Sequence, residues 1–249
     1  MIFTIARREI TTLFLSPLAW IILAVIQVLL GYMFLAQLDN FFLLQPQLLH
    51  LQNTPGVTDL VIAPLFQLAA TIMLMIMPLV TMRSIAEEKR NRTLCLLTSS
   101  PISIIELVLG KYLGLFFFVL ILVSLTMLMP LSLIPGTALD FGKLFSIFLS
   151  MLLLLGAFSA IGLYVSSLTE SQTIAAVGTI GALLMLWIID WIGESLTGSQ
   201  TILSYLSLLK HHQSLLEGVF DSSDIAYYLI LITLFLVLTM RQLDRERML

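Results

Sequence analysis

Six long runs of apolar residues, separated by short polar segments, fill most of this 249-residue sequence. A membrane-spanning helix needs about 20 apolar residues, because the hydrocarbon core is about 30 Å thick and a helix rises about 1.5 Å per residue. Apolar residues make up 59% of the chain, whereas soluble domains have about 45–50%. The sequence therefore predicts an all-α, polytopic membrane protein. The predicted spans run over about residues 18–38, 60–82, 108–133, 144–166, 172–192 and 225–240.

The basic residues predict the orientation of these spans. Six spans place both termini on one side of the membrane, together with the 83–107 and 167–171 loops. That side holds ten of the twelve lysines and arginines, and only Lys143 and Lys210 lie opposite. Because basic loops stay in the cytoplasm, we expect both termini to be cytoplasmic. The ten residues on that side are Arg7, Arg8, Arg83, Lys89, Arg90, Arg92, Lys111, Arg241, Arg245 and Arg247.

Residues 1–15 have the pattern of an amphipathic helix. Phe3, Ala6 and Ile10 recur at helical spacing, and Arg7 and Arg8 belong to the opposite, polar stripe. We expect this helix to lie in the cytoplasmic interface, with its arginines toward lipid headgroups or a partner. The pattern leaves open whether the helix is a simple lipid anchor or has a functional role.

A dense charged segment interrupts the apolar runs between the second and third spans. Five charged residues fall between positions 87 and 92, in a chain with only 11% charged residues. Charges are costly in hydrocarbon, so this segment must lie in water, at the membrane surface or against a partner. We expect a short helix at the cytoplasmic interface that exposes Glu87, Glu88, Arg90 and Arg92. Ser103 and Glu106 form a capping box that restarts a helix leading into the third span. An ordinary solvated loop is the alternative.

The sequence offers no catalytic, metal or cofactor site. Gly110-Lys111 lacks the spacing of a phosphate-binding loop, because Tyr112 follows it and Ile105 stands where the first glycine belongs. The acidic residues are scattered, and the adjacent His211 and His212 diverge on a helix, which is poor geometry for one metal ion.

Asp221 and Asp224 are interpreted as caps of the last span, and the single Cys95 excludes an internal disulfide. No ionisable group is expected at the membrane midplane, so energy for any transport must come from outside the chain. The pairs Gly156/Ala160 and Gly178/Ala182 would allow close helix packing.

Three segments resemble those of a known family. The string EKRNRTLCLLTSSPISIIELVLGK, residues 88–111, closely resembles the first cytoplasmic loop of ABC-2 type permeases of ATP-binding-cassette transporters. LYVSSLTESQTIAA, residues 163–176, is similar to that family's second cytoplasmic turn. Residues 206–228 resemble its last outer segment, especially in the gliding-motility and nitrous-oxide-reductase-maturation branches. The family often has glycine before the Thr-Leu pair, where this chain has Arg92, a difference that affects local helix geometry but not the assignment.

The resemblance implies an architecture and a contact set. It implies one ABC-2 transmembrane domain over residues 1–249, with six spans, an interfacial N-terminal helix and a cytoplasmic coupling helix that docks on an ATPase subunit, as in type V exporters. Glu170 is a second, weaker contact candidate. The implied ATPase contacts in the first loop are Glu87, Glu88, Lys89, Arg90, Arg92 and Thr93.

The resemblance also implies partners and a location. The chain is expected to be an exporter permease in the bacterial inner membrane, without catalytic activity or a cofactor of its own. Two copies of a cytoplasmic ATPase would carry ATP and Mg²⁺, and a second permease copy or a homologous permease would complete the pathway. Membrane lipid and an auxiliary subunit with an extracytoplasmic domain are further expected partners, and nucleic acid is not. The alternative function is a non-transporting membrane scaffold for an ATPase-driven assembly or motility machine.

Overall fold

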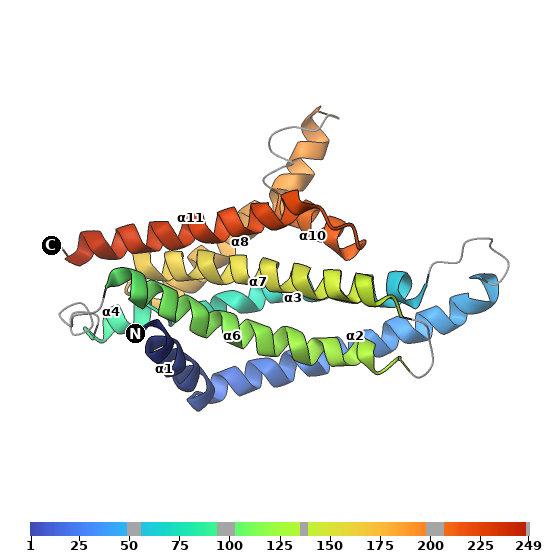
Figure 1. The fold of residues 1–249 in the computed structure, drawn as a ribbon, viewed down its shortest axis with the longest axis horizontal. Helices are drawn as coiled ribbons and strands as arrows, with labels where there is room; N and C mark the ends of the chain where they lie inside the picture. Colours follow the sequence, from blue (N-terminus) through green and yellow to red (C-terminus); the bar gives the residue numbers. More distant parts are fainter. Residues whose placement is uncertain (49–55, 94–102, 135–138, 198–206, 248–249) are drawn as a thin grey trace.

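The computed structural model describes residues 1–48, 56–93, 103–134, 139–197 and 207–247. Within these ranges the regular structure is entirely helical, and six segments are long and apolar enough to cross a membrane, as the sequence predicted. The N-terminus, the short helix α4 (Ala86–Arg90) and the end of the last helix, α11 (Ser222–Arg247), lie at one end of the elongated bundle, called here the termini-bearing end (Figure 1). The candidate spans are Pro17–Gln45, Thr58–Arg90, Ile104–Leu131, Phe141–Leu168, Gln172–Ile189 and Ser222–Arg247.

Helix α1 (Ile2–Leu15) forms the predicted amphipathic N-terminal helix and packs against α6 (Ile104–Leu131). Helix α2 (Pro17–Leu48) begins directly after Ser16 and is longer than the predicted span, which ended at residue 38. The prediction ended too early because Asp39 and Asn40 look like loop residues; both are exposed on the continuing helix. Apolar side chains between Met33 and Phe41 pack against the segment from Val57 to Leu65, which gives the extension a buried face.

The second candidate span begins as one turn of π-helix, η1 (Thr58–Ile62), and continues as α3 (Ala63–Thr81). Proline at position 64 suits this junction, because a residue in the first helical turn needs no N–H partner. After a short turn the chain forms α4 (Ala86–Arg90). The predicted charged helix therefore exists but is only five residues long.

Helix α7 (Phe141–Leu168) is the centre of the bundle. It packs against α3, α6, α8 (Gln172–Thr197), α10 (Leu208–Leu216) and α11 (Ser222–Arg247). Asp140 caps its start by accepting hydrogen bonds from two backbone N–H groups. The capping box of Ser103 and Glu106 at the start of α6 is also confirmed. These caps satisfy N–H groups that a helix terminus leaves without internal partners.

The outer segment does not lie on the bundle surface but packs into it through α10. His212 is fully buried, and its Nδ1 lies 2.7 Å from Oγ of Ser150 in α7. His211 Nδ1 lies 2.6 Å from Oδ1 of Asp224, so Asp224 pairs with a histidine and is not the expected cap. Asp221 does act as a local cap, accepting from the N–H of Ser223. These contacts fix α10 between α7 and α11.

Candidate functional site

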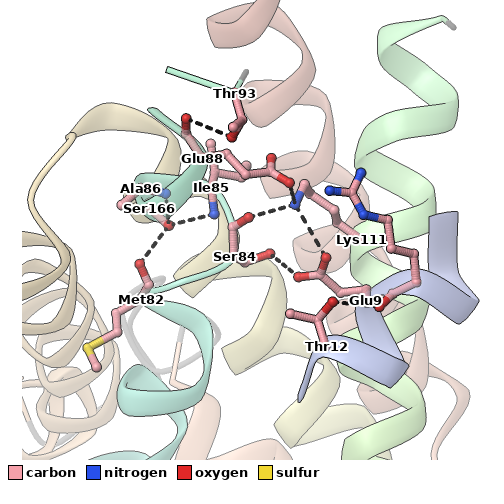
Figure 2. Close-up of polar contacts among 11 residues, drawn as sticks. Glu9, Thr12, Met82, Ser84, Ile85, Ala86, Glu88, Thr93, Lys111 and Ser166 are labelled. Atoms are coloured by element: carbon pink, nitrogen blue, oxygen red, sulfur yellow. Dashed lines mark hydrogen bonds and ion pairs between the residues drawn. The ribbon is translucent and has the colours of Figure 1, made fainter. Parts of the chain in front are cut away.

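The start of α4 is held by a side chain from another helix. Ser166, near the end of α7, accepts hydrogen bonds from the N–H groups of Ile85 and Ala86 at 3.2 and 3.0 Å (Figure 2). Its hydroxyl in turn donates to the carbonyl of Met82 at 3.1 Å. A helix terminus normally finds such partners within its own chain segment. Here the cap joins the charged segment to the central helix of the bundle.

The charged segment is also joined to α6 and α1 through a buried lysine. Lys111 in α6 is only 2% exposed, and its Nζ lies 2.9 Å from Oε1 of Glu88 in α4. The same ammonium group lies 3.4 Å from Oε2 of Glu9 in α1 and donates to the carbonyl of Ser84 at 2.7 Å. Figure 2 shows these three acceptors converging on Lys111. A buried ammonium is tolerated only with such partners, so this cluster fixes three elements relative to one another.

A second ion pair connects α4 to the last helix. Lys89, whose side chain is 8% exposed, pairs with Glu246 near the end of α11 and donates to the carbonyl of Ser167 at the end of α7. Together with Glu88 and Ser166, this contact ties a five-residue helix to α1, α6, α7 and α11. A displacement of α4 therefore strains direct contacts to α6, α7 and α11, and through Lys111 it also affects α1.

The end of α4 is a tight turn that faces outward. Arg92 has φ = 54°, its N–H donates to the carbonyl of Lys89, and the N–H of Thr93 donates to the carbonyl of Glu88 at 3.0 Å. This is a Schellman motif, in which glycine is the usual residue at the left-handed position. Arg90, Asn91, Arg92 and Thr93 are all exposed.

A family model for ABC-2 family transporter proteins matches residues 3–248. The chain belongs to the ABC-2 transporter family. No curated protein matches it. The family and the six spans make this chain a multi-pass membrane protein and a permease subunit of an ABC transporter.

The structure places the expected contact residues of this ABC-2 permease on two different faces. Glu88 was expected to be exposed and Lys89 to contact the ATPase, but they turn inward to Lys111 and Glu246. The physical reason is that each charge has a partner of opposite charge on another helix, the buried Lys111 of α6 for Glu88 and Glu246 near the end of α11 for Lys89. Glu87 is partly buried, and Glu170 is exposed in the turn between α7 and α8. Arg7 and Arg8 are exposed on α1, as expected.

Sequence reasoning missed the residues that hold the permease's α4 in place. Lys111, Glu9 and Ser166 were not among the expected site residues, although Lys111 and Ser166 bond directly to α4 and Glu9 binds the same ammonium group of Lys111. A signal existed for Lys111, because a lysine inside a predicted span requires acidic partners. No comparable signal marked Ser166, whose role depends on where α7 ends.

Replacing Arg92 with glycine should stabilise the turn of the permease's α4. A left-handed conformation costs a non-glycine residue about 1–2 kcal/mol, and part of this gain is lost to the flexibility of glycine in the unfolded chain. We expect hydrogen exchange of the Thr93 amide to slow by about two- to fivefold in Arg92→Gly. The matched control is Asn91→Gly, at a residue with φ = −83°, which should accelerate that exchange. Unchanged or faster exchange in Arg92→Gly would contradict the Schellman assignment.

Proposed function

We propose that this chain is the permease subunit of an ATP-binding-cassette exporter that is driven by ATP hydrolysis on a separate cytoplasmic subunit. The observation that carries the proposal is α4, whose inner face is bonded directly to α6, α7 and α11 and, through Lys111, to α1, while its end, from Arg90 to Thr93, is exposed. A short, exposed polar element tied to several spans can transmit movement from a partner into the membrane domain. The proposed contact surface is this exposed end of α4, with Glu170 beside α8 as a second contact.

The proposal includes an orientation and an assembly. The termini-bearing end is cytoplasmic, which places the basic residues inside, as expected for a bacterial inner-membrane protein. We infer a complex of two permease copies, identical or homologous, with two ATPase subunits. Helix α8 exposes Ile174, Val177 and Met185 by 63%, 65% and 75%, an apolar face that either lipid or the second permease copy can cover. The gliding-motility and nitrous-oxide-reductase-maturation permeases remain the proposed branch of the family, and an auxiliary outer subunit remains a proposed partner.

The test compares the permease alone with the permease co-purified with its ATPase. The isolated chain should neither bind nor hydrolyse ATP, whereas the complex should hydrolyse ATP and show two copies of each subunit by native mass spectrometry. Robust nucleotide binding by the isolated chain, or one permease per two ATPases, would contradict the proposal. ATP-dependent movement of cargo in reconstituted vesicles separates an exporter from a scaffold, which would hydrolyse ATP without moving cargo.

A further inference from the structure

A cavity of about 370 Å³ lies beside α4 at the termini-bearing end. Its size falls within the roughly 300–1,000 Å³ range of small-molecule sites. It is enclosed by α1, the start of α2, the end of α3, α4 and Lys111 of α6. The first candidate span begins here and the second ends here, where the hydrocarbon of a bilayer gives way to headgroups. The cavity can therefore hold a molecule at the depth of the lipid headgroups.

The lining of this cavity is divided into an apolar part and a charged part. The apolar part comes from the first turn of α2, the last turn of α3 and α1. The apolar residues are Leu13, Leu18, Ala19, Leu79 and Val80. The charged residues are Arg8, Arg83, Lys111, Glu9, Glu87 and Glu88. A lining with both characters suits an amphiphile better than a free ion.

The charges that remain after internal pairing have both signs. Lys111 is already bound to Glu9 and Glu88. Among the described residues, Arg83 and Arg8 form no ion pair, and the buried Nε of Arg83 has no hydrogen-bond partner. On the acidic side, the buried Oε2 of Glu88 has no hydrogen-bond partner within the described part of the chain. Glu87 also forms no ion pair with any residue that the structure describes.

We propose that this cavity binds the headgroup of a zwitterionic aminophospholipid of the phosphatidylethanolamine class. The phosphate lies against the guanidinium groups of Arg83 and Arg8, which suit phosphate recognition because they donate several directed hydrogen bonds. The ammonium group donates to Glu87 and to Oε2 of Glu88. The first carbons of the acyl chains lie against the apolar part of the lining.

Charge balance favours this lipid class over the alternatives. The six charged lining residues are three basic and three acidic, so their formal charges cancel. A headgroup with no net charge preserves this balance, whereas an anionic lipid adds a charge and leaves Glu88 without a donor. A choline headgroup carries a positive charge but has no N–H to donate. The proposal does not depend on the ATPase contact of the proposed function.

The test measures lipid retention by native mass spectrometry. The purified protein, delipidated in dodecyl maltoside, is incubated with palmitoyl-oleoyl phosphatidylethanolamine, phosphatidylglycerol or phosphatidylcholine, or with inorganic phosphate. We expect one retained phosphatidylethanolamine per chain, with the other two lipids bound at least about fivefold more weakly. Inorganic phosphate should not displace the lipid. Equal binding of phosphatidylglycerol, or displacement by phosphate alone, would overturn the proposal.

Substitutions of the lining residues test whether the lipid binds in the cavity. Arg83→Gln should weaken retention about tenfold, since a charge-assisted hydrogen bond is lost. Arg8→Gln should act in the same direction and, lying on an exposed position, should not disturb folding. Glu87→Gln should weaken the binding of phosphatidylethanolamine, because the ammonium group loses a charged acceptor, and should therefore reduce the preference for ethanolamine over choline.

Matched controls are Arg7→Gln for Arg8 and Arg90→Gln for Arg83, because each removes one positive charge from an exposed position outside the cavity. Controls that lose as much lipid as the cavity variants would overturn the proposal. Cavity variants that keep the lipid but lose the ATPase would overturn it too, because the cavity would then be a protein contact.

Discussion

Replacing Lys111 with methionine should be among the most destabilising single changes in this protein. The substitution leaves Glu9 and Glu88, which are 17% and 18% exposed, without the ammonium group that binds both. Removing one partner of a buried charge cluster typically costs about 3–5 kcal/mol, because the remaining charges stay desolvated. We expect a marked loss of thermal stability in detergent and reduced abundance in the membrane.

The loss should be recovered by removing the acidic partners. The triple variant Lys111→Met, Glu9→Gln, Glu88→Gln has no buried charge at this point and should regain at least half of the lost stability. Arg90→Met is the control for topology, since it removes one exposed positive charge at the same end of the bundle. If Lys111→Met and Arg90→Met were equally stable, the buried cluster would not hold α1, α4 and α6 together.

Replacing Gly162 with alanine should cause the second large effect. A Cβ atom at Gly162 in α7 would lie 2.2 Å from Oγ1 and 2.6 Å from Cβ of Thr81 in α3. Both residues are buried, so α3 and α7 would have to separate. Overpacking of this kind costs about 1–3 kcal/mol, and the tight backbone approach places Gly162→Ala at the upper end of that range. Thermal unfolding in detergent measures the effect.

Gly181→Ala is the matched control, because a Cβ there meets no atom within 4 Å. Inside a helix, alanine is more favourable than glycine by up to about 1 kcal/mol. This variant should therefore be as stable as the wild type or slightly more stable. Equal stability of Gly162→Ala and Gly181→Ala would show that α3 and α7 are not in close contact.

The sequence predicts the spans well because each is a long, continuous apolar run. The helix caps at Ser103 and Asp140 are local features as well, since each cap bonds only to residues a few positions away. The packing contacts could not be predicted in the same way. The sequence suggested Gly156 as a close-packing residue, and a Cβ there would lie 3.2 Å from the hydroxyl of Tyr112. The tighter contact at Gly162 depends on which helix α7 faces, and nothing local encodes that.

The candidate site was predicted in position but not in orientation. The charged segment does form a short helix, and its exposed end carries Arg90 and Arg92. The direction of Glu88 and Lys89 depends on Lys111 in α6 and on Glu246 in α11. Such partners are far away in the sequence and meet only when the helices pack. Reversing the charge of Glu88 would therefore test the fold rather than an ATPase contact.

The most direct test of the coupling proposal is a charge reversal at the exposed end of α4, measured in the complex with the ATPase. Arg90→Glu with Arg92→Glu should leave membrane abundance unchanged, because both side chains are exposed. If these arginines meet the ATPase, the reversed charges should cost several kcal/mol at the contact and abolish ATPase association or stimulation. The control is Arg245→Glu with Arg247→Glu, which makes the same charge change at exposed positions of α11. Loss of coupling only in the α4 variant is the predicted result, and wild-type coupling in that variant would contradict the proposed role of α4.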